Sequence, residues 1–228
     1  ESQYKIDLKK SIVKNIDFTN IGPSVMSGRV TDLEVNPKNT TEFYVAYASG
    51  GLWHTVNNGT TFNPIMDNSI TQNIGDFDID WNSRTIYVGT GESNSSRSSY
   101  PGIGILKSTD NGKTFSEPVR IAEDNFEFDG CVHVGAPMEI DSKGNLHTVW
   151  YTGKQGAPGM YYSTSTDNGE TFSEPIEVLV SDWIPPQRIF LTIDANDTVW
   201  VTWEDATGLS TNDRSWRYGD TQAMIYTA

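Results

Sequence analysis

The sequence predicts an all-β fold, a β-propeller of about four four-stranded antiparallel blades in a single domain spanning residues 1–228. Three observations predict it: one turn motif occurs three times, the same order of short strands recurs around each copy, and no segment has helical periodicity. The expected blades cover approximately residues 24–70, 71–124, 132–181 and 186–228, with a further N-terminal strand at 4–16.

The recurring motif reads [ST]-x-[DN]-x-G-x-x-F and begins at Thr55, Ser108 and Ser165. We call these three segments the box turns. In each, Asp or Asn accepts hydrogen bonds from nearby backbone N–H groups, Gly takes a positive φ, and Phe begins the next strand and packs beneath the turn. The Asn-Gly step is itself a hairpin signal. We therefore expect structural roles for Asn57, Gly59, Phe62, Asp110, Gly112, Phe115, Asp167, Gly169 and Phe172.

Strand patterns surround each box turn in a constant order, and four short strands per ~50 residues are typical of a propeller blade. The first unit is expected to contain Arg29–Val35, Glu42–Ala48, Gly51–Thr55 and Thr61–Ile65. The second contains Gly75–Trp81, Thr85–Gly89, Gly104–Ser108 and Lys113–Ile121. The third contains Ala136–Ile140, Leu146–Tyr151, Met160–Ser165 and Thr171–Val180. The fourth contains only Arg188–Ile193, Thr198–Trp203 and Ala223–Thr227.

The missing outer strand of the fourth unit leaves two arrangements open. Tyr4–Ile16 can supply that strand, which closes the ring with strands from both termini and hides two sheet edges. Alternatively, the chain is part of a larger ring. An incomplete ring with open edges predicts self-association, whereas a closed four-blade ring predicts a monomer.

Composition excludes several classes of function. Sixteen Lys and Arg oppose 30 Asp and Glu, giving a net charge of −14. Such a surface repels phosphate backbones and anionic lipids, so neither nucleic acid nor a membrane is an expected partner. No apolar run reaches the ~20 residues of a membrane span. No Cys/His cluster has metal-ligand spacing, so no metal or cofactor is expected, and the single Cys131 excludes an internal disulfide.

The box turns resemble the Asp boxes of the sialidase and sortilin-like superfamily of BNR-repeat propellers. Residues 21–115 are similar to sortilin-type and BNR glycosidase-like propellers, through Ile21-Gly22-Pro23, Ser27-Gly28-Arg29-Val30, Tyr87-Val88-Gly89-Thr90-Gly91-Glu92 and the box at Ser108. Residues 133–228 are closer to exo-sialidases, through Asp141-Ser142-Lys143-Gly144-Asn145-Leu146, Trp150-Tyr151 and the box at Ser165. The change near Phe115-Ser116-Glu117-Pro118 suggests a recombined or engineered chain as one hypothesis.

Blade geometry separates the box turns from the expected ligand face, which holds the connections between second and third strands and between blades. Arg29 and Arg188 begin inner strands near that face. The resemblance implies that such arginines bind a substrate carboxylate, because a planar guanidinium matches a carboxylate with two hydrogen bonds. Glu92 is the candidate acid. The competing interpretation is that each arginine is structural and paired with a nearby acid.

Further candidate ligand contacts occupy the same predicted face. Arg97 and Tyr100 belong to a long polar loop, and loops of that length are often functional. Tyr151, Trp203 and Glu204 lie at strand ends, where aromatic rings suit sugar faces. The alternatives are a solvated loop and, for the strand tryptophans, a core position.

Three functions remain open. The first is a non-catalytic propeller, extracellular or in the cell envelope, that binds a carbohydrate or protein ligand. The second is a sialidase-type glycoside hydrolase or a fragment of one, which requires three clustered arginines, a free acid and a Tyr–Glu pair. The third is an engineered propeller without a ligand. The incomplete catalytic set favours the first or third.

Overall fold

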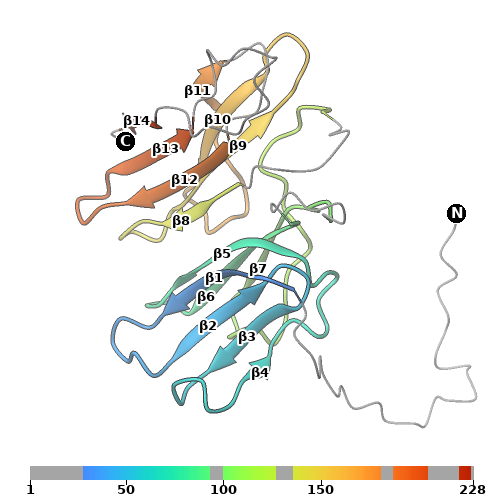
Figure 1. Cartoon of the computed structure of the whole chain (residues 1–228), viewed down its shortest axis with the longest axis vertical. Coiled ribbons are helices and arrows are strands. Elements are labelled where there is room, and N and C mark those ends of the chain that lie inside the picture. The colour runs from blue at the N-terminus through green and yellow to red at the C-terminus, as the bar shows by residue number, and fades with distance from the viewer. Residues whose placement is uncertain (1–27, 93–99, 127–135, 181–186, 205–220, 227–228) are drawn as a thin grey trace, which may run out of the picture.

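The computed structural model describes residues 28–92, 100–126, 136–180, 187–204 and 221–226, with only the backbone described for 187, 188, 204 and 221–226. These residues form strands, turns and loops without a helix, arranged as four antiparallel sheets in chain order (Figure 1). The predicted all-β class is confirmed. The predicted strand Tyr4–Ile16 lies outside the described residues.

The strands follow the predicted order within every sheet. The first sheet contains β1 (Val30–Val35), β2 (Phe43–Tyr47), β3 (Gly51–Thr55) and β4 (Asn63–Pro64). The second contains β5 (Ile74–Asp80), β6 (Thr85–Thr90) and β7 (Ile105–Ser108). The third contains β8 (Met138–Ile140), β9 (Leu146–Thr152), β10 (Gly159–Ser165) and β11 (Ile176–Val180). The fourth contains β12 (Gln187–Ile193), β13 (Val199–Glu204) and β14 (Thr221–Tyr226).

The second sheet differs from the prediction, because the expected strand Lys113–Ile121 does not form. An isolated bridge between Ile105 and Val119 stands in its place. Pro118 precedes that bridge and has no N–H to donate to a ladder, so pairing cannot extend through it.

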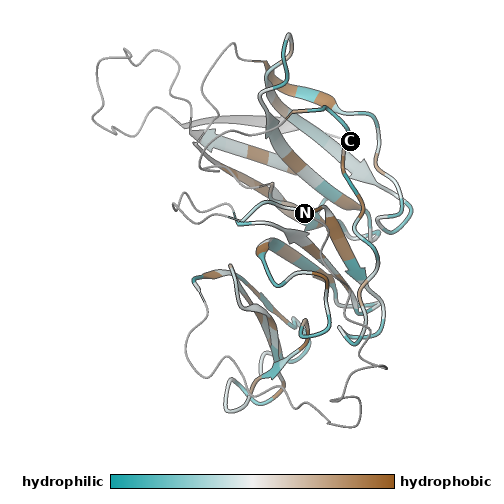
Figure 2. Cartoon of the chain, turned by 90° about the vertical axis from the view of Figure 1, so that its right-hand side faces the viewer, coloured by the Kyte–Doolittle hydropathy of each residue, from teal (hydrophilic) through white to brown (hydrophobic). Residues whose placement is uncertain are grey.

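Buried apolar side chains of successive sheets form three clusters. Apolar (brown) and polar (teal) residues are interspersed along the strands (Figure 2). Tyr44, Ala46, Phe77 and Ile79 belong to the cluster between the first and second sheets. Tyr87, Ile105, Met138 and Leu146 pack between the second and third sheets. Val149, Met160, Ile189, Leu191 and Val201 pack between the third and fourth sheets. Each sheet is therefore held by its neighbours in the chain.

The innermost strands β1, β5, β8 and β12 follow one another around a common axis. Contacts join β1 to β5, β5 to β8 and β8 to β12. No comparable packing joins β12 back to β1 among the described strands, so the four sheets form an open arc. Closure of the ring, which the sequence allowed, is not observed in this part of the chain.

The box turns have the geometry that their residue types predict. In the second sheet, Asp110 Oδ1 accepts hydrogen bonds from Thr114 N at 2.9 Å and from Ser108 Oγ at 2.8 Å. Asn111 and Gly112 both have positive φ, at 59° and 80°. The hydrogen bonds from Thr114 lower the pKa of Asp110 to about 2. The third-sheet turn repeats this pattern with Asp167 and Thr171, whose bonds lower the pKa of Asp167 to about 2.

Two of the three box-turn glycines lie where a side chain would collide with the preceding sheet. A Cβ on Gly112 would lie 2.5 Å from the Ile65 side chain, and a Cβ on Gly169 would lie 2.9 Å from the Tyr87 ring. In the first sheet, Gly59 instead lies against Phe62 and Phe43 of its own sheet, with the nearest atom at 3.5 Å. The turns of the second and third sheets therefore interlock with the sheet before them.

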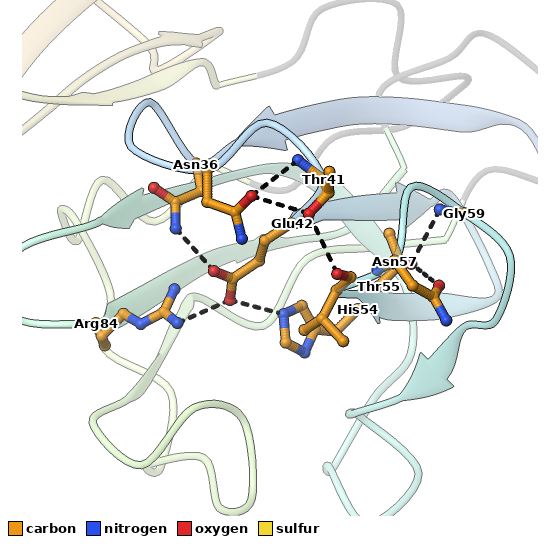
Figure 3. A network of polar contacts seen from close by, with 10 residues as sticks. Asn36, Thr41, Glu42, His54, Thr55, Asn57, Gly59 and Arg84 are labelled. Atoms are coloured by element: carbon orange, nitrogen blue, oxygen red, sulfur yellow. Dashed lines mark hydrogen bonds and ion pairs between the residues drawn. The ribbon is translucent and has the colours of Figure 1, made fainter.

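A polar network also joins the first and second sheets at the end of the strands where the box turns lie (Figure 3). The buried Glu42 carboxylate accepts hydrogen bonds from Arg84 Nη2 at 2.7 Å and Asn36 Nδ2 at 2.7 Å, and His54 Nε2 lies 3.1 Å from it. Although burial opposes it, these bonds hold the pKa of Glu42 below its usual value. Arg84 comes from the turn between β5 and β6, so the network spans two sheets.

We expect Gly112→Ala to destabilise the protein more than Gly59→Ala. Both residues have positive φ, which costs about 1 kcal/mol for alanine, but only the Gly112 methyl group would also collide with Ile65. The difference should be about 1–2 kcal/mol in the free energy of unfolding, measured by urea titration. Equal losses for the two variants would show that the contact between the sheets is not tight.

Candidate functional site

The two ends of the strands form two different surfaces. The box-turn face holds the box turns and residues 36–42, 81–84, 141–145 and 194–198. The loop face holds residues 48–50, 65–73, 91–92, 100–104 and 153–158. Inner strands begin at the loop face, so this face surrounds the mouth of the central axis. It is the face on which the sequence analysis expects the candidate ligand residues.

The long loop after β6 has a tightly built base. Thr90 Oγ1 accepts hydrogen bonds from Ile103 N at 2.8 Å and Gly104 N at 3.1 Å. Gly91 has a φ of 100°, and a Cβ there would lie 2.7 Å from Gly102 N. Glu92 N donates to Tyr100 O at 2.9 Å. These contacts fix the two ends of the loop, and with them the backbone that bears Glu92 and Tyr100.

Two predicted site residues meet at this base. Arg29, immediately before β1, donates through Nη2 to Glu92 Oε1. The Glu92 side chain is 7% exposed and that of Arg29 is 46% exposed, so the pair presents its guanidinium to solvent. A buried carboxylate is stable only when it is paired and hydrogen-bonded, and Arg29 supplies that partner. The structure therefore contains the arginine–acid pair that was the alternative to a substrate-binding arginine.

Tyr100 adds an exposed aromatic ring to the same part of the loop face. Its side chain is 47% exposed, and its backbone carbonyl accepts the Glu92 amide. Three of the predicted residues, Arg29, Glu92 and Tyr100, are thus brought together from the first and second sheets.

Of the other residues predicted to contact a ligand, the structure describes the side chains of Trp203 and Tyr151, and both pack against a different cluster. Trp203 is 2% exposed and belongs to the apolar cluster between the third and fourth sheets, a core position without an exposed ring face. Tyr151 is partly buried against the same cluster, and burial raises its pKa. Arg97 and the side chains of Arg188 and Glu204 lie outside the described residues.

A group of carboxyl side chains that the sequence analysis did not single out lines the axis beneath the loop face. We call it the axial carboxyl cluster; it consists of Asp32, Glu34, Asp76, Asp78 and Glu139, from β1, β5 and β8. Their signal in the sequence was the spacing of acids at alternate positions, Asp32 and Glu34 in one strand and Asp76 and Asp78 in another. The sequence alone did not show that these two strands lie side by side.

Several of these carboxylates bind the backbone of the next inner strand. Asp76 Oδ2 accepts a hydrogen bond from Met138 N at 2.7 Å, and Asp78 Oδ2 accepts one from Ile140 N at 2.6 Å. Asp32 likewise accepts from the Phe77 amide. The inner edge of a sheet exposes N–H groups that need partners. The carboxylates supply those partners and link β1 to β5 and β5 to β8.

Burial, together with repulsion between neighbouring carboxylates, raises the pKa values of these acids. Burial, with the charges of Asp78 and Asp32, raises the pKa of Glu34 to about 8. Burial and the same two charges raise the pKa of Glu139 to about 7. Burial raises the pKa of Asp78 to about 6, partly opposed by its hydrogen bonds from Ile79 and Ile140. Near neutral pH the axis therefore holds protons on some of its carboxyl groups.

A buried His–Tyr–Asp arrangement lies near the box-turn face of the third sheet. His147 Nδ1 is 2.6 Å from Tyr162 Oη, and His147 Nε2 is 3.4 Å from Asp141 Oδ2. Burial lowers the pKa of His147, although Asp141 opposes the shift. All three side chains are buried, so they stabilise the turn between β8 and β9 and offer no surface to a substrate.

The described residues contain no group of three or more His, Cys, Asp or Glu side chains arranged to hold a metal ion. Nor does any helix long and apolar enough to cross a membrane occur in this part of the chain.

Comparison with known families finds no family model that matches this chain. No curated protein sequence matches it either.

Solved structures do match. An ancestral GH74 enzyme superposes with a TM-score of 0.50 and 15% identity, over 78% of this chain and 22% of that enzyme's chain. The chain has a β-propeller-type fold. A GH74 xyloglucanase from Xanthomonas campestris matches with a TM-score of 0.49 and 13% identity, over 85% of this chain and 28% of that chain. An endo-arabinase from Bacteroides thetaiotaomicron matches with a TM-score of 0.48 and 15% identity, over 78% and 70% of the two chains. This chain thus spans about a quarter of the length of the two GH74 proteins.

We expect the free energy of unfolding to fall as pH rises from about 4.5 to 8. Glu34 has a higher pKa in the folded than in the unfolded chain, so the folded state binds more protons over this range and loses stability as they dissociate. Glu34→Gln should reduce the loss by about 1–2 kcal/mol, allowing for solvent screening around a half-buried group. The measurement is urea unfolding at pH 5 and pH 8.

Glu117→Gln is the matched control, because it removes the same formal charge from an exposed position. If both variants reduce the pH dependence of the free energy of unfolding equally, general charge repulsion causes that dependence, and the axial carboxyl cluster does not.

Proposed function

We propose that this chain is a non-catalytic, extracellular propeller module of the Asp-box type that binds carbohydrate on its loop face. The observation on which this rests is the convergence of Arg29, Glu92 and Tyr100 at the mouth of the axis. The fold shared with an ancestral GH74 enzyme is compatible with this function.

The chemistry of the three groups suits a sugar. The guanidinium of Arg29 is 46% exposed, and guanidinium groups bind sugar hydroxyl and carboxylate oxygens through their N–H donors. The Tyr100 ring offers an apolar face and a hydroxyl group. The Glu92 carboxylate orients the guanidinium, which reduces the entropy lost on binding.

The burial of Glu92 and its pairing with Arg29 favour binding of a carbohydrate over its hydrolysis. A glycosidase needs a carboxyl group that reaches the glycosidic oxygen and a second one across the bond. Glu92 is buried and engaged by Arg29, so its oxygen is turned toward the protein rather than toward a ligand.

We expect Tyr100→Ala to weaken carbohydrate binding roughly tenfold, because stacking of one ring on a sugar face contributes about 1–1.5 kcal/mol. The measurement is a glycan array followed by calorimetry, with xyloglucan, arabinan and sialylated oligosaccharides as probes. Tyr100 is exposed, so the fold should be unchanged in circular dichroism.

The control is Phe190→Ala, which removes an exposed aromatic ring, 60% exposed, from β12 in the fourth sheet. It should leave binding unchanged. Loss of binding in this control, or none of these glycans bound by the unaltered chain, would overturn the proposed site.

A second candidate, a sialidase-type glycoside hydrolase, is favoured by one observation. The pKa of Glu139, about 7, lies where a general acid works at neutral pH. The binding proposal predicts no turnover of chromogenic glycosides, including a sialoside. Turnover that Glu139→Gln abolishes, with folding intact, would establish the hydrolase and exclude the non-catalytic module.

A further inference from the structure

The first sheet exposes a face that the other sheets bury. Along each inner strand, alternate side chains point toward the preceding sheet. In β5 these are Phe77 and Ile79, and in β12 they are Ile189 and Leu191, all of which are buried. In β1 the corresponding residues are Leu33 and Val35, since Asp32 and Glu34 point toward the second sheet.

Leu33 and Val35 are exposed because no described sheet precedes the first. Their exposed fractions are 47% and 38%, and the adjacent Val30 and Phe62 are 55% and 40% exposed. The first box turn shows the same difference, because Gly59 contacts only its own sheet whereas Gly112 and Gly169 contact the sheet before them. We call this surface, formed by Val30, Leu33, Val35 and Phe62, the leading face.

The fourth sheet has the complementary surface at the other end of the arc. Its inner strand buries Ile189 and Leu191 against the third sheet and directs Phe190, 60% exposed, to the opposite side. Trp200, on the neighbouring strand, is half-buried on that side. We call the surface formed by Phe190 and Trp200 the trailing face. It occupies the position that packs against the next sheet in the first three sheets.

We propose that two copies of this chain associate head to tail, with the leading face of one copy packed on the trailing face of the other. The contact continues the series of interfaces that already joins the four sheets of one chain, in which apolar strand positions of successive sheets pack together. The two faces differ, so the interface is heterologous, and it buries apolar area that a single arc exposes to water.

The net charge of each copy makes the strength of association depend on the salt concentration. Each copy has a net charge of −14, so two copies repel one another. Salt screens that repulsion, whereas the apolar contact is not weakened by it. Association therefore strengthens as the salt concentration rises, the reverse of what a contact held by ion pairs would show.

The test is sedimentation velocity on the full chain over a range of concentrations in low and moderate salt. We expect a mass above that of the monomer that increases with concentration, because each head-to-tail contact leaves one leading and one trailing face for a further contact. Leu33→Asp blocks the leading face and Phe190→Asp blocks the trailing face, and each should weaken association roughly tenfold or more, because a charge would be buried in the contact. Ile70→Asp is the control. Ile70 is 67% exposed and lies in the connection between the first two sheets, outside both end faces, so this variant should associate as the unaltered chain does.

Mixing the two blocked variants tests the head-to-tail mode. Each alone should be monomeric, whereas a mixture retains one intact leading face and one intact trailing face and should form a 1:1 dimer. A monomeric unaltered chain under all conditions overturns the proposal. So does a Phe190→Asp variant that still dimerises by itself, because that result shows pairing of two identical faces.

Discussion

The arrangement of the sheets depends on carboxylates that bind backbone amides across the axis. The inner edge of each sheet presents N–H groups that no further strand pairs, and leaving such groups buried and unpaired costs about 1–3 kcal/mol each. Asp32 bonds the amide of Phe77, and Asp76 and Asp78 bond amides of β8. These bonds therefore join β1 to β5 and β5 to β8, each an inner strand and the next inner strand along the chain.

This arrangement concentrates negative charge where the sheets meet, and burial of like charges explains the raised pKa values of Glu34 and Glu139. Protonation of these groups relieves the repulsion, so the same acids that align the strands also make their packing depend on pH. The candidate sugar site lies at the mouth of this axis. Its buried acid, Glu92, has a different environment, because Arg29 compensates its charge.

The series of interfaces between sheets is interrupted at both ends of the described arc. Sheets in the interior have both faces covered, whereas Leu33 at one end and Phe190 at the other are exposed to solvent. Exposed apolar surface on the broad face of a sheet is unusual for an isolated unit and typical of an interaction site. The loop face and these two end faces are separate surfaces, so the proposed carbohydrate site and the proposed association involve different residues.

The sequence by itself determined the strand order, the turns and the blade repeat, because hairpins depend on local residue types: Asn-Gly supplies the backbone conformation, and the preceding Asp or Asn supplies the acceptor. It also indicated Arg29, Glu92 and Tyr100 as neighbours of one face. Only the tertiary structure decided that Glu92 is paired with Arg29, that Trp203 is a core residue and that alternate acids from three strands meet at the axis. Those outcomes depend on which strands lie side by side, and contacts between residues more than 60 positions apart are not encoded in any local pattern.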